Sequence, residues 1–262
     1  MVGRKKRRSK GAELLGSHQK CWIWGRHAVL ETLRAGRWPP LEVTVDPTWL
    51  DDAVQSELTK LVALQQITLT EMSGPDLSRL CGATEHQGLL AKMPPYPYAS
   101  MEMVLKKLHG GSAVLVLAGV QDPFNFGSIL RSADVFGFDA VFVPSKGQAS
   151  VSAHVTRSSV GAVNYLDIVQ MEEPLDCCRR LKTLGLQLVA ATEKGEHAPA
   201  HVNLQSGTAL LIGNEGTGIP VELLEISDLQ VCIPLQGHIN SLNAAVAAGI
   251  LCYELRRQRE SL

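Results

Sequence analysis

The chain has 262 residues, of which 45% are hydrophobic and 19% are charged, so it is long enough for one large or two modest domains with a sizeable core. Its net charge of −1 is unevenly spread, because residues 1–20 hold seven Lys or Arg side chains and a single acid, which leaves −7 for the remainder. The six cysteines show no Cys-x-x-Cys spacing and no apolar run reaches the roughly 18 residues of a membrane span, which argues against a disulfide framework, a zinc site or a membrane protein.

Residues 1–18 are expected to form a basic, disordered arm. On a mildly acidic body such an arm suits a nucleic-acid partner, whose phosphates attract it without any reading of sequence. A solvated tail without a partner is the alternative. Residues 11–18 are too polar and too short for the core of a signal peptide, so we expect a cytoplasmic protein that does not contact a membrane.

Short strands and helices alternate over residues 19–94, which predicts a small α/β domain. The expected strands cover 22–24, 41–45, 66–70 and 86–93, and the expected helices run up to Gly36 and over 51–64 and 75–80. Three prolines within residues 94–97 then remove backbone donors and stiffen the chain, so residues 95–112 are expected to be a linker that holds a short helix over 101–109.

A second and larger β/α series begins near residue 113 and continues to residue 262. The expected strands cover 114–118, 140–143, 166–169, 187–191, 209–212 and 230–233, and the expected helices cover 127–136, 153–160 and 174–184. A last helix follows an N-cap at Asn240 or Ser241, with an apolar face formed by Leu242, Val246, Ile250 and Tyr253. Continuous apolar strands that alternate with helices predict a mostly parallel sheet covered on both faces, whose ligands lie at the carboxyl ends of its strands.

Three segments that follow strands are polar and rich in glycine. The first carries Asn125 and Arg131, the second carries Glu215 between two glycines, and the third carries Asn240, Ser241 and Asn243. Taken singly, the asparagines are explained by helix capping and Arg131 by a surface position, but three such segments at strand ends favour a ligand site. The glycine motifs of dinucleotide and P-loop sites and the Gly-x-Ser-x-Gly elbow are absent, and the eight histidines lack metal spacing, so no metal is expected.

These segments resemble the three motifs of the SpoU (TrmH) family of RNA ribose 2′-O-methyltransferases. The matching residues are Asn125-Phe-Gly-Ser-Ile-Leu-Arg131, Ile212-Gly-Asn-Glu-Gly216, and Ile233-Pro-Leu followed by Ser241-Leu-Asn243 and Ala247-Ala-Gly. The resemblance covers residues 113–259. Residues 23–29 and 86–88 are similar to the ribosomal-protein-like RNA-binding domain in front of many members, most of all those that modify a guanosine of large-subunit ribosomal RNA. One departure is Ala244-Ala245, where many members have Val-Ser; we expect no loss of activity from it.

The resemblance implies a deep trefoil knot in the C-terminal domain, a homodimer formed through that domain, and S-adenosylmethionine as the cofactor. It implies that Arg131 is the central catalytic residue, either as a base or as a stabiliser of the ribose alkoxide, and that four other side chains orient it: Asn125, Glu215, Ser241 and Asn243. The residues implied to hold the cofactor are Thr192, Leu211, Gly213, Ile233, Leu235 and Leu242.

The sequence therefore predicts methyl transfer to a ribose 2′-hydroxyl of RNA, with a guanosine of 23S ribosomal RNA as the expected target. Transfer RNA is an alternative substrate. A non-catalytic RNA-binding or ribosome-assembly factor on the same scaffold is the competing class, although a pure binder has no need of Asn125, Glu215 and Asn243 together. An oxidoreductase on a doubly wound sheet lacks its glycine motif.

Overall fold

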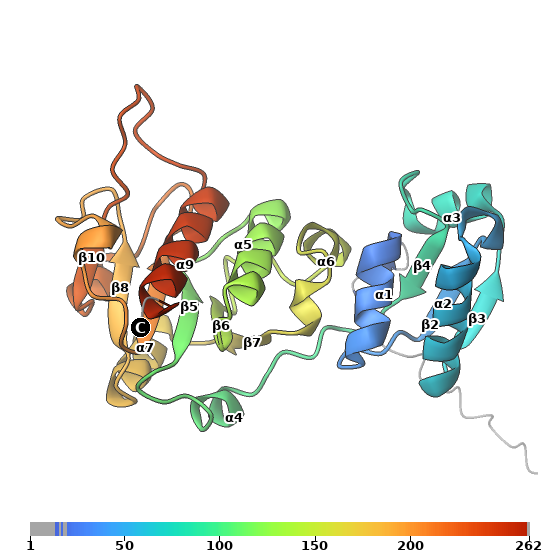
Figure 1. Ribbon diagram of the computed structural model, residues 1–262, viewed down its shortest axis with the longest axis horizontal. Coiled ribbons are helices and arrows are strands. Elements are labelled where there is room, and N and C mark those ends of the chain that lie inside the picture. The colour runs from blue at the N-terminus through green and yellow to red at the C-terminus, as the bar shows by residue number, and fades with distance from the viewer. Residues whose placement is uncertain (1–13, 16, 18–19, 261–262) are drawn as a thin grey trace, which may run out of the picture.

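The computed structural model describes residues 14–15, 17 and 20–260, which form two α/β domains side by side (Figure 1). Most of the predicted basic arm lies outside the described residues. Where its end is described, the Leu15 N–H donates to the carbonyl of Met93 at 3.0 Å, and Leu14 and Leu15 pack against the hydrophobic core. Residues 14–15 are therefore attached to the N-terminal domain.

The N-terminal domain is a four-stranded mixed sheet in the order β1-β4-β2-β3. Only β2 and β3 run parallel; the other two pairings are antiparallel. Its elements are β1 (Trp22–Trp24), α1 (Arg26–Ala35), β2 (Glu42–Val45), the 3-10 helix η1 (Pro47–Trp49), α2 (Asp52–Leu64), β3 (Thr68–Glu71), α3 (Gly74–Cys81) and β4 (Leu89–Lys92). The predicted small α/β domain is thus confirmed, with a sheet of its own.

The C-terminal domain is built on a six-stranded sheet in the order β10-β8-β9-β5-β6-β7, and every pairing in it is parallel. The strands are β5 (Ala113–Leu117), β6 (Ala140–Pro144), β7 (Asp167–Met171), β8 (Gln187–Ala191), β9 (Thr208–Ile212) and β10 (Leu229–Val231). Parallel order brings all six carboxyl ends to one edge, above which the loop between β10 and the last helix rises (Figure 1). The mostly parallel sheet is confirmed, while the trefoil knot stays a prediction.

Helices cover both faces of this sheet, as its two separate core clusters require. One face packs α5 (Pro123–Val135) and α9 (Ala244–Glu260) in a cluster that continues into the N-terminal domain. The other face packs α4 (Met101–Leu105), α7 (Pro174–Thr183) and α8 (Val221–Glu225). The remaining elements are α6 (Ala153–Ser158) and the 3-10 helices η2 (Ala162–Asn164) and η3 (Pro199–His201).

Two predicted helix starts are wrong. Helix α5 begins at Pro123, four residues before the predicted Gly127, because the Asp122 carboxylate caps it and proline suits the first helical position. Helix α9 begins at Ala244, and its cap is Asn243 instead of Asn240 or Ser241. Both corrections matter for the site, because they place the two asparagines at helix starts.

The predicted apolar face of the last helix points away from the core. Val246, Ile250 and Tyr253 are between 41% and 55% exposed, whereas the buried residues of α9 are Ala244, Ala248, Leu251, Cys252 and Leu255. Small side chains on the buried face let α9 lie close to α5, and Gly249 faces Ser132 there. The larger apolar side chains therefore form a surface stripe.

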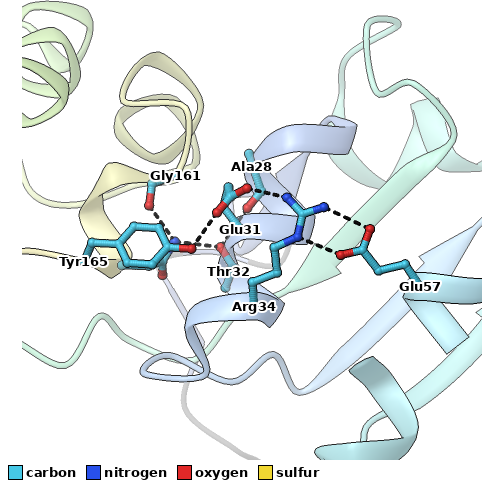
Figure 2. A network of polar contacts seen from close by, with 8 residues as sticks. Ala28, Glu31, Thr32, Arg34, Glu57, Gly161 and Tyr165 are labelled. Atoms are coloured by element: carbon cyan, nitrogen blue, oxygen red, sulfur yellow. Dashed lines mark hydrogen bonds and ion pairs between the residues drawn. The ribbon is translucent and has the colours of Figure 1, made fainter. Parts of the chain in front are cut away.

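A polar network joins the two domains where α1 meets η2 (Figure 2). The Asn164 side-chain amide donates to the Thr32 hydroxyl at 3.0 Å and to the carbonyl of Gly161 at 2.9 Å, and both side chains are buried. The Tyr165 hydroxyl donates to Glu31, which also pairs with Arg34. These bonds and the shared core hold the N-terminal domain against the face of the C-terminal sheet that α5 covers, so the interface between the domains is packed and hydrogen-bonded.

The proline-rich segment is packed against the C-terminal domain. The Tyr96 hydroxyl donates to the carbonyl of Val163 at 2.7 Å, and the Tyr98 hydroxyl accepts from the backbone of Val151 at 3.0 Å. Ala99 pairs with Val169 as an isolated bridge beside β7. Burial raises the pKa of Tyr98, in keeping with a hydroxyl held inside the protein. The segment thus connects the domains and also adds to their interface.

None of the helices within the described residues combines the length and apolar character needed to cross a bilayer. In the same part of the chain, no three His, Cys, Asp or Glu side chains are grouped so that they could hold a metal ion.

Candidate active site

The loop that follows β9 is a tight hairpin held by its own backbone. Asn214 and Gly218 exchange two backbone hydrogen bonds, at 3.0 and 2.9 Å. The Asn214 side-chain oxygen accepts from the N–H groups of Gly216 at 2.7 Å and Thr217 at 3.1 Å. A Cβ added to Gly213 would lie 2.7 Å from the backbone carbon of Gly218, so only glycine fits there. The hairpin is therefore a fixed shape before any ligand binds.

Asn214 also ties this hairpin to the loops after β5 and β6. Its amide donates to the carbonyl of Gly119 at 2.5 Å, while the N–H of Val120 donates to the Gln148 side chain at 2.8 Å. Gly119 has φ +97°, and a Cβ there would lie 3.1 Å from the carbonyl oxygen of Gly147. Three strand-end loops are thus bonded together. Sequence reasoning did not single out Asn214, although its place between two glycines after a strand was a signal.

Helix α5 carries Asn125 into this region. Pro123 starts the helix and the Asp122 carboxylate accepts from the N–H of Phe124 at 3.0 Å, so Asn125 lies in the first turn and its side chain is not used for capping. The Asn125 amide donates to the Glu215 carboxylate at 2.9 Å. The start of α5 is thereby joined to the hairpin after β9.

Asn243 completes the connection from the start of α9. Its side-chain oxygen accepts from the N–H groups of Ala245 at 2.9 Å and Val246 at 3.3 Å, which is N-capping. Its side-chain amide donates to the Asn125 oxygen at 2.9 Å. One chain of hydrogen bonds therefore runs from Asn243 through Asn125 to Glu215, and it joins all three polar segments at the carboxyl edge of the sheet.

Arg131 and Ser241 lie outside this chain of bonds. Arg131 is exposed on α5, six residues after Asn125, and it makes no hydrogen bond or ion pair with the described residues. Ser241 is exposed in the loop before α9 and is likewise unbonded within the described part of the chain. The structure thus brings together three of the five predicted catalytic residues and leaves the guanidinium of Arg131 facing solvent.

The loop between β10 and α9 has the properties of an open cradle. Its apolar side chains are uncovered, with Leu235 41%, Ile239 75% and Leu242 37% exposed. Within the described part of the chain, the backbone N–H groups of residues 235–242 make no hydrogen bond. Exposed apolar side chains beside unpaired donors suit a ligand that has both a flat apolar group and polar atoms.

Of the other residues predicted to hold the cofactor, three lie after strand ends and one is buried within a strand. Thr192 is half-buried after β8, and its N–H donates to the carbonyl of Val231 at 3.0 Å. Ile233 is half-buried just after β10. Leu211 is fully buried within β9, so its side chain packs in the core beneath the site. Thr192, Gly213 and Ile233 therefore lie after the ends of neighbouring strands, whereas Leu211 lies below them.

Comparison with known proteins places this geometry in a family. Residues 112–253 match the model of the SpoU rRNA Methylase family, and residues 22–99 match the model described as RNA 2′-O ribose methyltransferase substrate binding. A Staphylococcus aureus protein that carries the name TrmH family tRNA/rRNA methyltransferase is 34% identical over 245 residues, with 92% of this chain and 97% of that protein covered.

Solved structures agree with the sequence matches. The SpoU methyltransferase AviRb from Streptomyces viridochromogenes, solved in complex with AdoMet, is similar with a TM-score of 0.79 and 26% identity, with 95% of this chain and 96% of AviRb covered. A crystal structure of an RNA 2′-O ribose methyltransferase has a TM-score of 0.74 and 30% identity, with 93% and 90% of the two chains covered. Both matches span the two domains. With its six parallel strands, its joined strand-end motifs and its separate N-terminal sheet, this chain belongs to the SpoU rRNA Methylase family and is an RNA methyltransferase.

Proposed function

We propose that this protein transfers the methyl group of S-adenosylmethionine to a ribose 2′-hydroxyl of RNA, and that the target is a guanosine of large-subunit ribosomal RNA. The observation that carries the proposal is the bonded chain Asn243–Asn125–Glu215, which gathers three distant motifs beside an exposed loop with unpaired donors. A protein that only binds RNA has no need for this arrangement. The family's model supports ribosomal RNA, while the Staphylococcus aureus relative's name includes both tRNA and rRNA.

The donor set fits the cofactor. Leu235 and Leu242 offer exposed apolar side chains for adenine, and the free N–H groups of residues 235–242 offer partners for its ring nitrogens and for the ribose. The backbone of Gly218 approaches Gly213 closely and gives the hairpin after β9 a fixed shape, which would form one side of the cofactor site. Thr192 and Ile233, which follow the neighbouring strands, would form the other side. S-adenosylmethionine supplies an electrophilic methyl group on a positively charged sulfur.

Arg131 is proposed as the catalytic residue. A ribose 2′-hydroxyl is a weak nucleophile at neutral pH, so its proton must leave as the oxygen attacks the methyl carbon. A guanidinium stays protonated at neutral pH, and five N–H donors let it bind the emerging alkoxide and the adjacent phosphate together. Stabilisation is therefore the role that its chemistry favours over that of a base. Its lack of partners within the described residues supports a guanidinium available to substrate.

The orienting roles fall to the bonded side chains. Asn125 is held between Glu215 and Asn243, so its position is fixed by two partners. The Glu215 carboxylate has a second oxygen that can accept from a ribose hydroxyl or hold the Arg131 guanidinium. Ser241 is exposed two residues before the α9 cap and can donate to the same substrate. Together these groups would aim the 2′-hydroxyl.

A homodimer through the C-terminal domain is part of the proposal. Val246, Ile250 and Tyr253 form an exposed apolar stripe on α9, and Val135 on α5 is 68% exposed. The Phe136 and Tyr253 rings lie 6.0 Å apart beside a hollow of about 510 Å³ between the ends of the two helices. Contiguous apolar surface of this kind is typical of protein interfaces. Because Arg131 and the exposed Val135 are four residues apart on α5 and share a face, such a dimer would bring the partner close to Arg131.

The compartment follows from the proposed substrate. Ribosomal RNA is processed where ribosomes are made, so we place the activity in the cytoplasm. The six cysteines are free thiols, five of them buried, which suits a reducing compartment. The basic residues at the start of the chain, whose placement lies outside the described residues, are proposed to add nonspecific affinity for RNA.

Arg131→Ala is the variant that tests the function. Calorimetric titration with S-adenosylmethionine is expected to give the wild-type affinity, while methyl transfer to RNA falls by at least about a hundredfold. Arg179→Ala is the matched control, since Arg179 is also an exposed arginine without a partner in the described residues but lies on α7, on the opposite face of the sheet. Silence in the titration of the wild type would favour a non-catalytic RNA-binding factor. Near-normal turnover in Arg131→Ala would refute the assigned role.

A further inference from the structure

An exposed aromatic side chain lies directly beside the bonded site residues. Phe124, in the first turn of α5, is 59% exposed although it is a large apolar residue, and it precedes Asn125 in the chain. Its ring centre is 5.8 Å from that of His154, which is exposed at the start of α6. The two rings are tilted by 50°, so they do not cover each other's faces. Phe124 thus offers a ring face next to the site.

The same contacts continue across α6 to the N-terminal domain. The His154 ring meets Trp24 edge to face at 5.3 Å, and the Arg157 guanidinium lies 5.7 Å above the Trp24 ring. Arg157 pairs with Glu85 of the N-terminal domain at 2.6 Å, yet its side chain is 40% exposed. A surface ion pair of this kind exchanges easily with a phosphate. Helix α6 lies between α5 and the N-terminal domain, which makes this a continuous path (Figure 1).

Trp49 forms the far end of this path and is held as a platform. It is 49% exposed, and its ring lies 5.0 Å from that of His86, which is buried and bonded to Ser78 and to the N–H of Gly88. A Cβ on Gly88 would lie 2.5 Å from the Trp49 Cβ, and one on Gly74 would lie 3.4 Å from its ring. The fold therefore makes room for this tryptophan and supports one side of it, while the other side faces solvent.

A second arginine accompanies Trp49. Arg26, at the start of α1, donates to the carbonyl of Trp49 at 3.1 Å and pairs with Asp51 at 3.4 Å. Its side chain is 33% exposed. The contacts run from Phe124 through His154 and Trp24 to Arg157, which pairs with Glu85. The next residue in the chain, His86, contacts Trp49.

We propose that these five residues, which we name the stacking strip (Phe124, His154, Arg157, Arg26 and Trp49), bind a single-stranded segment of the RNA substrate next to the modified nucleotide. The inference rests on the proposed function, because it extends the substrate from the site onto the N-terminal domain. Flat rings with free faces stack on bases, and the cations between them match the phosphates. Paired bases in a duplex do not offer their faces to such rings, so the segment must be unpaired.

The stacking strip also gives a reason for the packed interface between the two domains. Two stacking platforms on different domains read one strand only if their separation is fixed. The buried bond of Asn164 to Thr32 and the core shared by the two domains hold them together, and neither depends on Arg157. The strip therefore selects RNA whose unpaired segment reaches from the modified ribose to Trp49.

The test measures binding of a fluorescent single-stranded RNA of about 20 nucleotides, and of the same RNA in a full duplex, by anisotropy over a range of salt concentrations. Phe124→Ala and Trp49→Leu are each expected to weaken single-strand binding by about five- to a hundredfold, while Phe124→Tyr keeps it. Arg157→Ala is expected to lower the slope of log affinity against log salt by about one. Affinity for S-adenosylmethionine is expected to stay within about twofold in all four.

Matched controls lie on the other face of the C-terminal domain. Arg180 pairs with Glu102 at 2.7 Å and its side chain is 39% exposed, close to the values of Arg157, and Met103 is 64% exposed. Arg180→Ala and Met103→Ala are expected to bind both RNAs as the wild type does. Thermal melts identify any variant that loses stability, and Phe124→Ala serves as the decisive variant because its side chain is mostly exposed.

Wild-type affinity of Phe124→Ala and Arg157→Ala for the single strand would overturn the strip, as would an equal loss in the two controls. The proposed function fails separately: a wild type that methylates no ribosomal or transfer RNA, but whose single-strand binding depends on Phe124 and Trp49, would refute methyl transfer and keep the strip.

Discussion

The Asn243 side-chain amide has two functions, one for each of its ends, and different substitutions can separate them. Its oxygen caps α9 through Ala245 and Val246, and its nitrogen donates to Asn125. Asn243→Ala removes both functions. Asn243→Asp keeps an oxygen for the cap and adds a negative charge, which a helix N-terminus favours, but it removes the donor. Whichever way the Asn125 amide turns, its oxygen then faces a carboxylate of residue 243 or of Glu215.

The sizes of the two effects follow from these bonds. Losing an N-cap costs about 1 kcal/mol, and losing an exposed side-chain hydrogen bond costs about 0.5–1.5 kcal/mol. Asn243→Ala is therefore expected to lose about 1.5–2.5 kcal/mol of the free energy of unfolding, or roughly 3–10 °C in melting temperature for a chain of this size. Asn243→Asp loses the same bond to Asn125, but it keeps the cap and gains about 0.3–1 kcal/mol from a negative charge at the helix N-terminus, so it is expected to stay within about 1 kcal/mol of the wild type.

The assay combines urea unfolding, followed by circular dichroism, with methyl transfer from tritiated S-adenosylmethionine to ribosomal RNA. Both variants are expected to lose at least about tenfold in turnover, a loss of about 1.4 kcal/mol in transition-state stabilisation. Asn240→Ala is the matched control, since Asn240 lies in the same loop without a bond to the described residues, and it should leave stability unchanged. An Asn243→Asp enzyme with full turnover, or an Asn243→Ala enzyme with full stability, would refute the reasoning.

Four further predictions test the site, the domain interface and the arm. Gly213→Ala forces a methyl group against the backbone of Gly218, so we expect it to cost about 1–3 kcal/mol of stability and to weaken cofactor binding, whereas Gly216→Ala, which meets only a side-chain oxygen at 3.4 Å, should do neither. Asn164→Ala leaves the buried Thr32 hydroxyl without its donor, and chemical unfolding should show a loss of about 1–3 kcal/mol. Burial raises the pKa of Asp167, but its bonds to Lys107 and Arg37 outweigh that effect and hold the pKa below its ordinary value of 3.8. The stability from this depressed pKa is present above pH 3.8 and lost as pH falls below it, so Asp167→Asn should flatten the fall in unfolding free energy between about pH 4.5 and pH 3; an unchanged slope would count against the ion pair. Deleting residues 1–13, which keeps Leu15 and its bond to Met93, should weaken RNA binding and reduce its salt dependence, and equal salt slopes would show that the arm does not touch RNA.

Periodicity and composition predicted the layers of the fold because the physical signals are local. The apolar runs at 113–117 and 208–212 are strands buried on both faces, as a central parallel strand requires. The order of the six strands has no such signal, because it depends on long-range pairing. The start of α5 does have a local signal in the pair Asp122-Pro123, a cap followed by the residue that suits the first helical turn, and this signal outweighs the glycine at 127.

The sequence motifs identified the residues of the site but not the hydrogen bonds between them. The motifs placed Asn125, Glu215 and Asn243 at strand ends, but which amide donates to which oxygen depends on helix starts that pattern alone placed too late or too early. The surface of α9 shows a second feature that the sequence pattern does not determine. Apolar spacing identifies a face but not its partner, so the stripe of Val246, Ile250 and Tyr253 was visible in the sequence while its exposure was not.

The most direct test of the central claim is a map of 2′-O-methylated positions in ribosomal and transfer RNA from cells with and without this gene. We expect a single guanosine of large-subunit ribosomal RNA to lose its methyl group in the deletion strain, and the wild-type gene to restore it while Arg131→Ala does not. Identical maps in the two strains would contradict it.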